Sequence, residues 1–250
     1  MSDNVPCGTI LKNEVYMIIE KDRFCSLFAD NGFEITDKIY DDFSTYSQLL
    51  VEWNEKINLT AITDPEGITI KHFLDSLLLM KYADIKENSS LIDVGTGAGF
   101  PGIPLKIYRR DLKVTLLDSL NKRINFLNEV SENLELGMKC IHSRAEEGGR
   151  NPKLREKFDI ATARAVAAMP VLCEYCLPYV KQGGIFAAMK GPNEDISAAE
   201  NAVKLLGGSI ENIYNYELNG DKRTIIIVRK ISHTPPKYPR NSGQISKKSL

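Results

Sequence analysis

The stretch that decides the fold is Leu91-Ile92-Asp93-Val94-Gly95-Thr96-Gly97-Ala98-Gly99-Phe100-Pro101-Gly102. Its apolar start is typical of a buried strand, and four glycines follow within eight residues. A helix is predicted to resume after this loop. A strand, a glycine loop and a helix in this order bring backbone N–H groups against a nucleotide-like ligand. Glycine suits such a loop because it tolerates a positive φ and has no Cβ to keep the ligand away.

Two ligand classes fit the glycine spacing. Gly97-x-Gly99-x-x-Gly102 matches the dinucleotide-binding pattern, which is a weak signal on its own. However, Asp93 stands at the strand end, where an NAD-binding strand is usually apolar. The run from Asp93 to Gly99, with glycine at every second position after the aspartate, resembles the first motif of the Rossmann-like S-adenosylmethionine (SAM) methyltransferases. The stretch therefore favours SAM over a dinucleotide, with a purely structural loop as the third interpretation.

Length and composition are those of an ordinary globular protein. The 250 residues are enough for one large domain with its own core, and 43% are hydrophobic and 26% charged. No run approaches eighteen apolar residues, and the first residues lack the features of a signal peptide, so we expect no membrane span and no secretion. Five cysteines, an odd number, favour reduced thiols and a cytoplasmic location.

The net charge of −1 is unevenly distributed. Seven basic and no acidic residues lie between Arg223 and Leu250, so the preceding 222 residues carry a net charge of −8. A basic end on an acidic body is typical of a protein that approaches a polyanion from one side. A solubilising, disordered tail is the alternative, and charge alone does not decide between the two.

The first part of the chain is predicted to be helical, after a disordered start over residues 1–11. Apolar residues recur at helical spacing from Lys12 to Ala29, and Asp30-Asn31-Gly32 then ends the helix with glycine as the cap. A second helix is predicted from Asp37 to Ile57, with its aromatic residues packed in the core rather than stacked on bases. Asp64-Pro65 begins a third helical segment that ends near Tyr82.

From Ser90 onward strands alternate with helices, which predicts a doubly wound, mostly parallel sheet. The hairpin signal Asn219-Gly220-Asp221 makes the last strand antiparallel. The predicted fold class is therefore α/β, a Rossmann-like, doubly wound and mostly parallel sheet with an antiparallel last strand and an N-terminal helical extension. The predicted parts are a helical extension over residues 1–66, a Rossmann-like domain over 67–232 and a basic flexible tail over 233–250.

The boundaries of these elements follow from the same patterns. The expected strands are Leu91–Val94, Val114–Leu117, Met138–Ile141, Phe158–Thr162, Ile185–Met189, Ser209–Leu218 and Thr224–Arg229. The expected helices between them run from about Asn121 to Leu134, from Pro170 to Val180 and from Glu194 to Leu206. Residues 145–156 are expected to be loop-like or weakly helical, and a turn is expected over residues 181–184.

Ligands of such sheets lie beyond the carboxyl ends of the strands, so the residues after each strand are candidates. Asp118 can accept both ribose hydroxyls of an adenosine, or it can be a solvated acid or a helix cap. Ser143, Arg144, Ala145, Glu146 and Glu147 follow the third strand; a backbone N–H and a carboxylate in this run fit an adenine edge, or the paired acids are simply solvated. Arg164 stays protonated and is no base, but it can orient a carboxylate, a phosphate or a guanine edge, or form a surface ion pair. Lys190 lines the pocket or faces solvent.

Other chemistries find little support in the sequence. His72, His142 and His233 are too dispersed for a metal site, and Cys173-x-x-Cys176 is interpreted as two thiols one helical turn apart. No Asn-Pro-Pro-Tyr-like motif follows the fourth strand, which argues against methylation of exocyclic amino groups. No cysteine stands there as a nucleophile for carbon methylation.

Several motifs together carry a closer resemblance, over roughly residues 40 to 230. They are Trp53-Asn54-x-x-x-Asn58-Leu59-Thr60, His72-x-x-Asp75-Ser76, Asp93-Val94-Gly95-Thr96-Gly97-x-Gly99-x-Pro101-Gly102-Ile103-Pro104-Leu105, Leu117-Asp118-Ser119 with Lys122-Arg123, Ser143-Arg144-x-Glu146 and Ala163-Arg164-Ala165. In this combination they resemble the RsmG (GidB) family, bacterial methyltransferases of guanine N7 in 16S ribosomal RNA.

The resemblance implies SAM as the methyl donor and direct in-line transfer to guanine N7, which needs no general base because N7 carries no proton. It implies no catalytic residue, with Arg164 as a positioning candidate that can also touch the substrate. We expect 16S ribosomal RNA or the small ribosomal subunit as partner, no membrane, no metal, and a monomer in the cytoplasm. The implied SAM contacts are Gly95, Phe100, Ala145, Glu146 and Arg164, to which the strand-end argument adds Gly97 and Asp118.

Three rival functions remain at this point. The first is a SAM enzyme that acts on a small molecule, with an incidental basic end. The second is a non-catalytic RNA-binding or assembly factor that retains the fold, and the third is an NAD-dependent oxidoreductase. Methyl transfer without RNA would identify the small-molecule enzyme. RNA binding that does not depend on SAM would identify the assembly factor, and a change in nicotinamide absorbance would identify the oxidoreductase.

Overall fold

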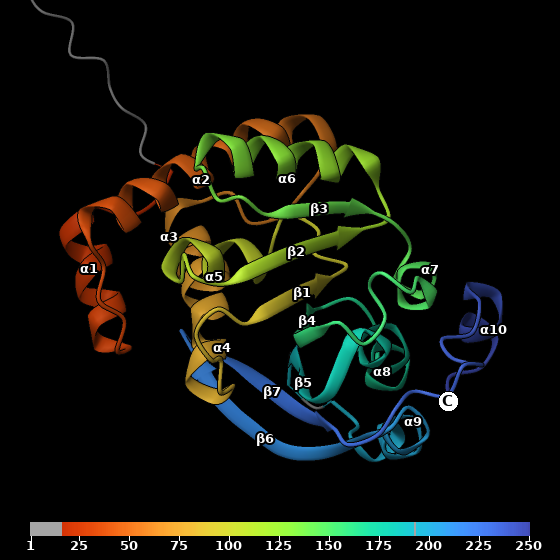
Figure 1. The fold of residues 1–250 in the computed structure, drawn as a ribbon. Coiled ribbons are helices and arrows are strands. Elements are labelled where there is room, and N and C mark those ends of the chain that lie inside the picture. The colour runs from red at the N-terminus through yellow and green to blue at the C-terminus, as the bar shows by residue number, and fades with distance from the viewer. Residues whose placement is uncertain (1–16, 193) are drawn as a thin grey trace, which may run out of the picture.

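The computed structural model describes residues 17–192 and 194–250. One sheet runs through the middle of the molecule with helices on both of its faces (Figure 1). The elements in chain order are α1 (Lys21–Asp30), α2 (Asp37–Ile57), α3 (Pro65–Gly67), η1 (Ile68–Leu74), α4 (Asp75–Tyr82), β1 (Ser90–Val94), α5 (Gly102–Tyr108), β2 (Lys113–Asp118), α6 (Asn121–Asn133), β3 (Lys139–His142), α7 (Ala145–Arg150), β4 (Phe158–Arg164), α8 (Met169–Cys176), η2 (Leu177–Tyr179), β5 (Val180–Lys190), η3 (Ser197–Ala199), α9 (Glu200–Leu205), β6 (Gly208–Leu218), β7 (Asp221–Lys230) and α10 (Ser242–Lys247).

The strands form a seven-stranded sheet in the order β3-β2-β1-β4-β5-β7-β6. Strands β1 to β5 pair in parallel, and β7 is antiparallel to both β5 and β6. The predicted fold class is confirmed, including the antiparallel end of the sheet and the helices that precede it. Strand order reverses between β1 and β4, so the loops leaving these two strands frame a crevice at the carboxyl edge.

Alternating side chains of the central strands fill two separate cores. On β4, Ile160 belongs to the core shared with α1, α2, α4, α5 and α6, whereas Ala161 belongs to the core shared with α8 and α9. On β7, Ile225 and Ile226 divide in the same way. Burial on both faces explains why these strands are continuous apolar runs in the sequence.

Helix α2 spans exactly the predicted residues. Its start is fixed by Thr36, whose hydroxyl accepts the N–H of Ile39 at 3.3 Å. Its aromatic residues pack in the core as predicted: Phe43 lies 4.7 Å from Phe73 between ring centroids, and Tyr46 lies 5.4 Å from the same ring.

The first helix starts later than predicted, at Lys21 rather than Lys12. Residues 1–16, which include the expected disordered start, lie outside the described residues. The backbone of Ile19 forms hydrogen bonds with other elements and not within a helix. Its N–H donates to Thr69 Oγ1 at 3.4 Å, and its carbonyl accepts the Tyr40 hydroxyl at 3.3 Å. The predicted end is confirmed, with Gly32 at a φ of +78°.

The third helical segment also has the predicted limits, but a π-helical turn interrupts it. Asp64 caps its start by accepting the N–H of Gly67 at 2.7 Å. The wider turn η1 follows and carries His72, and α4 continues from Asp75. Such turns inside helices often occur at functional sites.

Residues 145–156, expected to be loop-like or weakly helical, form the short helix α7 followed by turns. Two other expectations after residue 144 are wrong. Helix α8 ends at Cys176 instead of near Val180, because Pro178 has no N–H to continue it. Residues 181–184 are not a turn before the fifth strand but a bulge within β5, where Gly183 has a φ of +82° and the register with β4 shifts.

The helix predicted from Glu194 to Leu206 is shorter in the structure. A single 3₁₀ turn covers Ser197–Ala199, and α9 begins only at Glu200. The Asp195 carboxylate accepts the Ser197 hydroxyl at 2.6 Å and the Ala198 N–H at 3.2 Å. These local bonds compete with helix formation upstream.

Residues 233–250, predicted to be a flexible tail, are packed against the body (Figure 1). The Arg155 guanidinium donates to the carbonyls of Thr234 at 2.7 Å and Tyr238 at 2.8 Å. Arg240 pairs with the fully buried carboxylate of Glu174 on α8 at 2.7 Å. These contacts hold the segment against the body, and its flexibility stays a prediction. Among the described helices, none is long and apolar enough to cross a membrane.

Candidate active site

The loop between β1 and α5 presents bare backbone at the carboxyl edge of the sheet. Gly95, Gly97 and Gly99 have φ values of +70°, +61° and +100°, which L side chains rarely adopt. A Cβ built on Gly97 would meet no atom within 4 Å, so this residue faces open space. A Cβ on Gly95 would lie 3.0 Å from a methyl group of Val166.

The other glycines of the loop serve packing. A Cβ on Gly99 would lie 2.3 Å from Cδ1 of Ile103, and one on Gly102 would lie 2.5 Å from Cδ2 of Leu116. These two positions let helix α5 sit directly on the strand. The weak dinucleotide spacing thus includes glycines that are needed for the helix and not for a ligand.

Asp93 lies fully buried under the glycine loop at the end of β1. Its Oδ2 accepts the Thr96 hydroxyl at 2.6 Å and the Gly102 N–H at 2.9 Å. Its Oδ1 is buried and has no hydrogen-bond partner in the part of the chain that the structure describes. Burial raises the pKa of the Asp93 carboxyl to about 6. An oxygen of this kind would gain a bond from a ligand that brings a donor.

Asp118 and Gly97 are in direct contact. Oδ2 of Asp118 accepts the Gly97 N–H at 2.9 Å and a guanidinium N–H of Arg123 at 3.3 Å, while Oδ1 accepts the N–H of Leu120 at 2.9 Å. The carboxylate therefore fixes the loop and the start of α6 together. Oδ2 thus already accepts two hydrogen bonds and Oδ1 accepts one, so Oδ1 can still receive one hydroxyl group from a ligand.

Two adjoining cavities follow this edge of the sheet. The larger, of about 410 Å³, lies over the glycine loop, and the smaller, of about 150 Å³, reaches α7. Both are lined by Gly95, Ser119 and Val166, and we call the pair the loop groove. It brings together every predicted cofactor residue: Gly95, Gly97, Phe100, Asp118, Ala145, Glu146 and Arg164.

Tyr179 packs against α7 at the end of the loop groove. The Ala145 carbonyl accepts the Tyr179 hydroxyl at 2.7 Å, and a Cβ on Gly148 would lie 2.3 Å from the same hydroxyl oxygen. Close packing of α7 on Tyr179 thus sets the position of Ala145 and of the buried Glu146 side chain.

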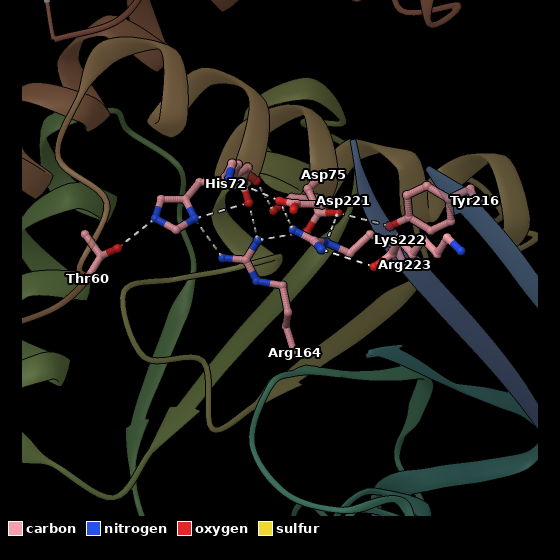
Figure 2. Close-up of polar contacts among 10 residues, drawn as sticks. Thr60, His72, Asp75, Arg164, Tyr216, Asp221, Lys222 and Arg223 are labelled. Atoms are coloured by element: carbon pink, nitrogen blue, oxygen red, sulfur yellow. Dashed lines mark hydrogen bonds and ion pairs between the residues drawn. The ribbon is translucent and has the colours of Figure 1, made fainter. Parts of the chain in front are cut away.

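Arg164 forms one wall of the loop groove and is held from several sides (Figure 2). Its Nη1 donates to the Lys71 carbonyl and to Asp75 Oδ2, each at 3.1 Å. Its Nη2 donates to His72 Nδ1 at 3.2 Å, and its Cζ lies 4.7 Å from the ring centroid of Phe100. The guanidinium is therefore oriented by the protein itself.

His72 is neutral and fully engaged. Nδ1 lies 3.2 Å from Nη2 of Arg164 and 3.3 Å from the Lys71 carbonyl, and Nε2 lies 2.8 Å from Thr60 Oγ1. Since a guanidinium can only donate, we assign the ring proton to Nε2. The ring also stacks on Phe100 with 4.3 Å between centroids. Desolvation and the charge of Arg164 lower the pKa of His72 to about 3. His72 consequently positions Arg164 and has no free lone pair to accept a proton from a ligand.

A further cavity of about 320 Å³, which we call the hairpin cavity, adjoins the loop groove at His72, Arg164 and Ala165. Asp75 connects its walls, since Oδ1 accepts the Tyr216 hydroxyl at 3.0 Å and lies 3.7 Å from Nε of Arg223. The lining residues outside the shared three include Ile62, Lys71, Asp75, Met189, Lys190, Tyr216 and Arg223.

Lys190 lines the hairpin cavity, but its ammonium group already has partners within the protein. Its Nζ donates to the Ala167 carbonyl at 2.6 Å and pairs with Glu194 at 3.0 Å. These contacts tie the end of β5 to the loop that follows Arg164.

The sequence argument identified Arg164 but not the residues that orient it. His72 and Asp75 were detectable, because residues three apart in a helical segment lie on one face. Tyr216 and Arg223 gave no such signal. They meet Asp75 only because they are register partners across the β6–β7 hairpin.

His142, His233 and the described cysteines lie outside this site. His142 contacts the Ser119 carbonyl at 3.0 Å, and His233 pairs with Glu156 at 2.7 Å. Cys173 and Cys176 are buried free thiols whose pKa values are raised by burial. Within residues 17–192 and 194–250, no cluster of three or more His, Cys, Asp or Glu side chains could hold a metal ion.

The fold places the chain in a class. It is similar to the precorrin-6y C5,15-methyltransferase of Geobacter metallireducens GS-15, with a TM-score of 0.51 and 13% identity over 70% of this chain and 92% of that chain. It is also similar to a putative methyltransferase of Bacillus halodurans C-125, with a TM-score of 0.50 and 14% identity over 64% of this chain and 100% of that chain. The fold is that of the class I SAM-dependent methyltransferases.

Sequence comparison is more specific. A family profile described as GidB, rRNA small subunit methyltransferase G, matches residues 39–226. Proteins named ribosomal RNA small subunit methyltransferase G are similar over nearly their whole length: that of Clostridium beijerinckii is 54% identical over 88% of this chain and 95% of its own, and that of Clostridium perfringens strain 13 is 53% identical over 88% and 94%. The chain belongs to the rRNA small subunit methyltransferase G (GidB) family.

Proposed function

We propose that this protein transfers the methyl group of SAM to N7 of a guanine in 16S ribosomal RNA, in line and without a general base. The observation that carries the proposal is the junction at Arg164. Here a groove suited to SAM meets a second, cation-lined cavity, and the side chain at the junction cannot take up a proton.

The residues of the loop groove fit SAM. Gly97 offers open space where any other residue would place a side chain, and Oδ1 of Asp118 has acceptor capacity for a ribose hydroxyl. The start of α7 offers the backbone of Ala145 and the carboxylate of Glu146 to an adenine edge. When bound, SAM supplies a methyl group on a positively charged sulfur.

The neighbouring side chains suit an acceptor that has no proton to lose. Guanine N7 is an aromatic lone pair, so the reaction needs alignment and not a base; positioning can supply up to about 7–11 kcal/mol. His72 is neutral with both ring nitrogens engaged. Arg164 can donate to the O6 of a guanine, which would hold the base with N7 toward the donor.

Support for an RNA substrate comes from the family and from charge. The relatives are named as methyltransferases of small-subunit ribosomal RNA. Four cations line the hairpin cavity: Lys71, Arg164, Lys190 and Arg223. Three carboxylates pair with them, those of Asp75, Glu194 and Asp221. The remaining excess of positive charge favours a phosphate backbone. We propose that the protein acts in the cytoplasm, as a monomer.

The test is transfer of tritiated methyl from SAM to unmodified 16S ribosomal RNA and to small ribosomal particles. We expect incorporation that requires RNA and the protein. Transfer to small molecules without RNA would favour the first rival function, and RNA binding with no incorporation would favour an assembly factor.

A further inference from the structure

Two cations that line the hairpin cavity, Lys71 and Arg223, share one exposed carboxylate, that of Asp221. Figure 2 shows Asp221 beside Arg223. Asp221 Oδ2 lies 3.1 Å from Nζ of Lys71 and 3.2 Å from Nη2 of Arg223. The Asp221 side chain is 40% exposed, and those of Lys71 and Arg223 are 37% and 24% exposed. The three side chains come from η1 and from the start of β7, so the fold and not the local sequence brings them together.

The two cations have donors that the protein leaves available. Arg223 uses Nη1 for the Lys222 carbonyl at 3.2 Å and Nη2 for Asp221, and a guanidinium has five N–H groups. Lys71 has three, with Asp221 as its ion-pair partner. The hydrogen bonds and charges of Lys71 and Arg223 lower the pKa of Asp221, which is consistent with a site built for an anion.

We propose, resting on the proposed function, that Lys71 and Arg223 bind a backbone phosphate of the RNA next to the target guanine. In the free protein the Asp221 carboxylate occupies this position, and the phosphate displaces it. A phosphate presents more acceptor oxygens than a carboxylate and matches the unused donors of both cations.

The position of this site explains why a phosphate there would matter for methyl transfer. Asp75 contacts Arg223 at 3.7 Å through Oδ1 and Arg164 at 3.1 Å through Oδ2. The phosphate site and the guanidinium that faces the cofactor are therefore two ends of one ion-pair network. Phosphate contacts set the register of a nucleic acid, and this contact would set which nucleotide reaches Arg164.

The experiment measures binding of unmodified 16S ribosomal RNA as a function of salt, for variants with opposite expected effects. Asp221→Asn removes the competing carboxylate and is expected to tighten RNA binding about threefold or more. Arg223→Gln and, independently, Lys71→Gln each remove a phosphate contact. Each should weaken binding about tenfold and reduce the salt slope by about 0.7–0.9.

Arg229→Gln is the matched control. Arg229 has the same side chain on the same strand, is paired with Glu211 at the exposed far end of β7, and does not line the hairpin cavity. It should bind RNA like the wild type. SAM affinity measured by calorimetry should stay within twofold of wild type in Asp221→Asn and Lys71→Gln, which separates lost phosphate contacts from a damaged fold.

The outcomes separate this inference from the proposed function. If the wild type methylates the RNA but Asp221→Asn binds it more weakly than wild type, Asp221 is a contact and not a placeholder, and the inference is overturned. Unchanged affinity and slope in both Lys71→Gln and Arg223→Gln would also overturn it, with the proposed function intact. A wild type that neither binds nor methylates ribosomal RNA overturns both.

Discussion

At the residue scale, Gly97 carries the clearest prediction about the cofactor site. Gly97→Asp places a charged side chain in the open space of the loop groove, so we expect SAM binding to be lost. Isothermal titration calorimetry measures this directly. Retained affinity for SAM would contradict the site.

Gly137→Asp is the matched control for that prediction. Gly137 has the same φ of +61°, and a Cβ there would also meet nothing within 4 Å. It lies in the turn between α6 and β3 and does not line the loop groove. The two variants share the backbone strain of an L residue at positive φ, and only Gly97→Asp should lose SAM.

His72 predicts a specific dependence of stability on pH. Its pKa is about 3 in the folded protein and about 6.5 when unfolded, so the unfolded state binds more protons between these values. The contribution of neutral His72 to the free energy of unfolding is complete above about pH 6.5. It decreases as the pH falls below that value, by about 2 kcal/mol at pH 5. His72→Asn does not titrate there and keeps an acceptor for Arg164.

Urea unfolding of both proteins at pH 7 and pH 5 checks this. We expect the difference in free energy of unfolding between wild type and His72→Asn to shrink by about 2 kcal/mol from pH 7 to pH 5. Asp93, whose raised pKa of about 6 acts in the opposite direction between about pH 4 and 6, is common to both proteins and cancels. A pH-independent difference would contradict a buried neutral His72.

The site residues differ in how far the sequence could predict them. Gly97, Asp118 and Arg164 follow strands directly, and parallel strands bring their carboxyl ends to one edge, so topology alone brought them together. The role of Asp75 could not be derived in this way. It depends on where the β6–β7 hairpin meets the start of α4, which is set by packing between segments far apart in the chain.

At the element scale, the C-terminal segment makes the strongest prediction about stability. Arg240→Gln leaves the carboxylate of Glu174 fully buried without its cation. We expect a loss of about 3–5 kcal/mol in the free energy of unfolding, measured by urea denaturation at pH 7. The double variant Glu174→Gln with Arg240→Gln removes the charge as well and should recover part of that loss. Near-wild-type stability of Arg240→Gln would contradict a packed segment.

This segment also shows where sequence patterns fail for elements. Helix α2 was predictable because its cap and its periodic apolar face agree. The residues after Ser232 have turn-forming and basic composition, which also describes a disordered tail. The packing of this segment depends on its partners in the body. The Pro239 carbonyl accepts a hydrogen bond from Arg150 at 2.6 Å, and the carbonyls of Tyr238 and Thr234 accept hydrogen bonds from Arg155. No local pattern contains that information.

At the scale of the whole molecule, the basic end of the sequence is not a basic arm in space. Much of its charge is neutralised within the body, while the cations that line the hairpin cavity come from η1, β4, β5 and β7. Charge alone left a polyanion partner and a solubilising tail open, and the structure places one residue of the basic end, Arg223, at the hairpin cavity. The internally paired residues of this end are Arg223 with Asp221, Arg229 with Glu211, Lys230 with Glu156, and Arg240 with Glu174.

The most direct test of the central claim is the identity of the methylated nucleoside. Unmodified 16S ribosomal RNA is incubated with the protein and labelled SAM, digested to nucleosides and separated by chromatography with mass detection. We predict that the label co-migrates with 7-methylguanosine, that it is absent with Gly97→Asp, and that it is retained with Gly137→Asp. Label in an exocyclic or carbon-methylated nucleoside, or none with the wild type, would contradict an enzyme that aligns SAM with an unprotonated ring nitrogen.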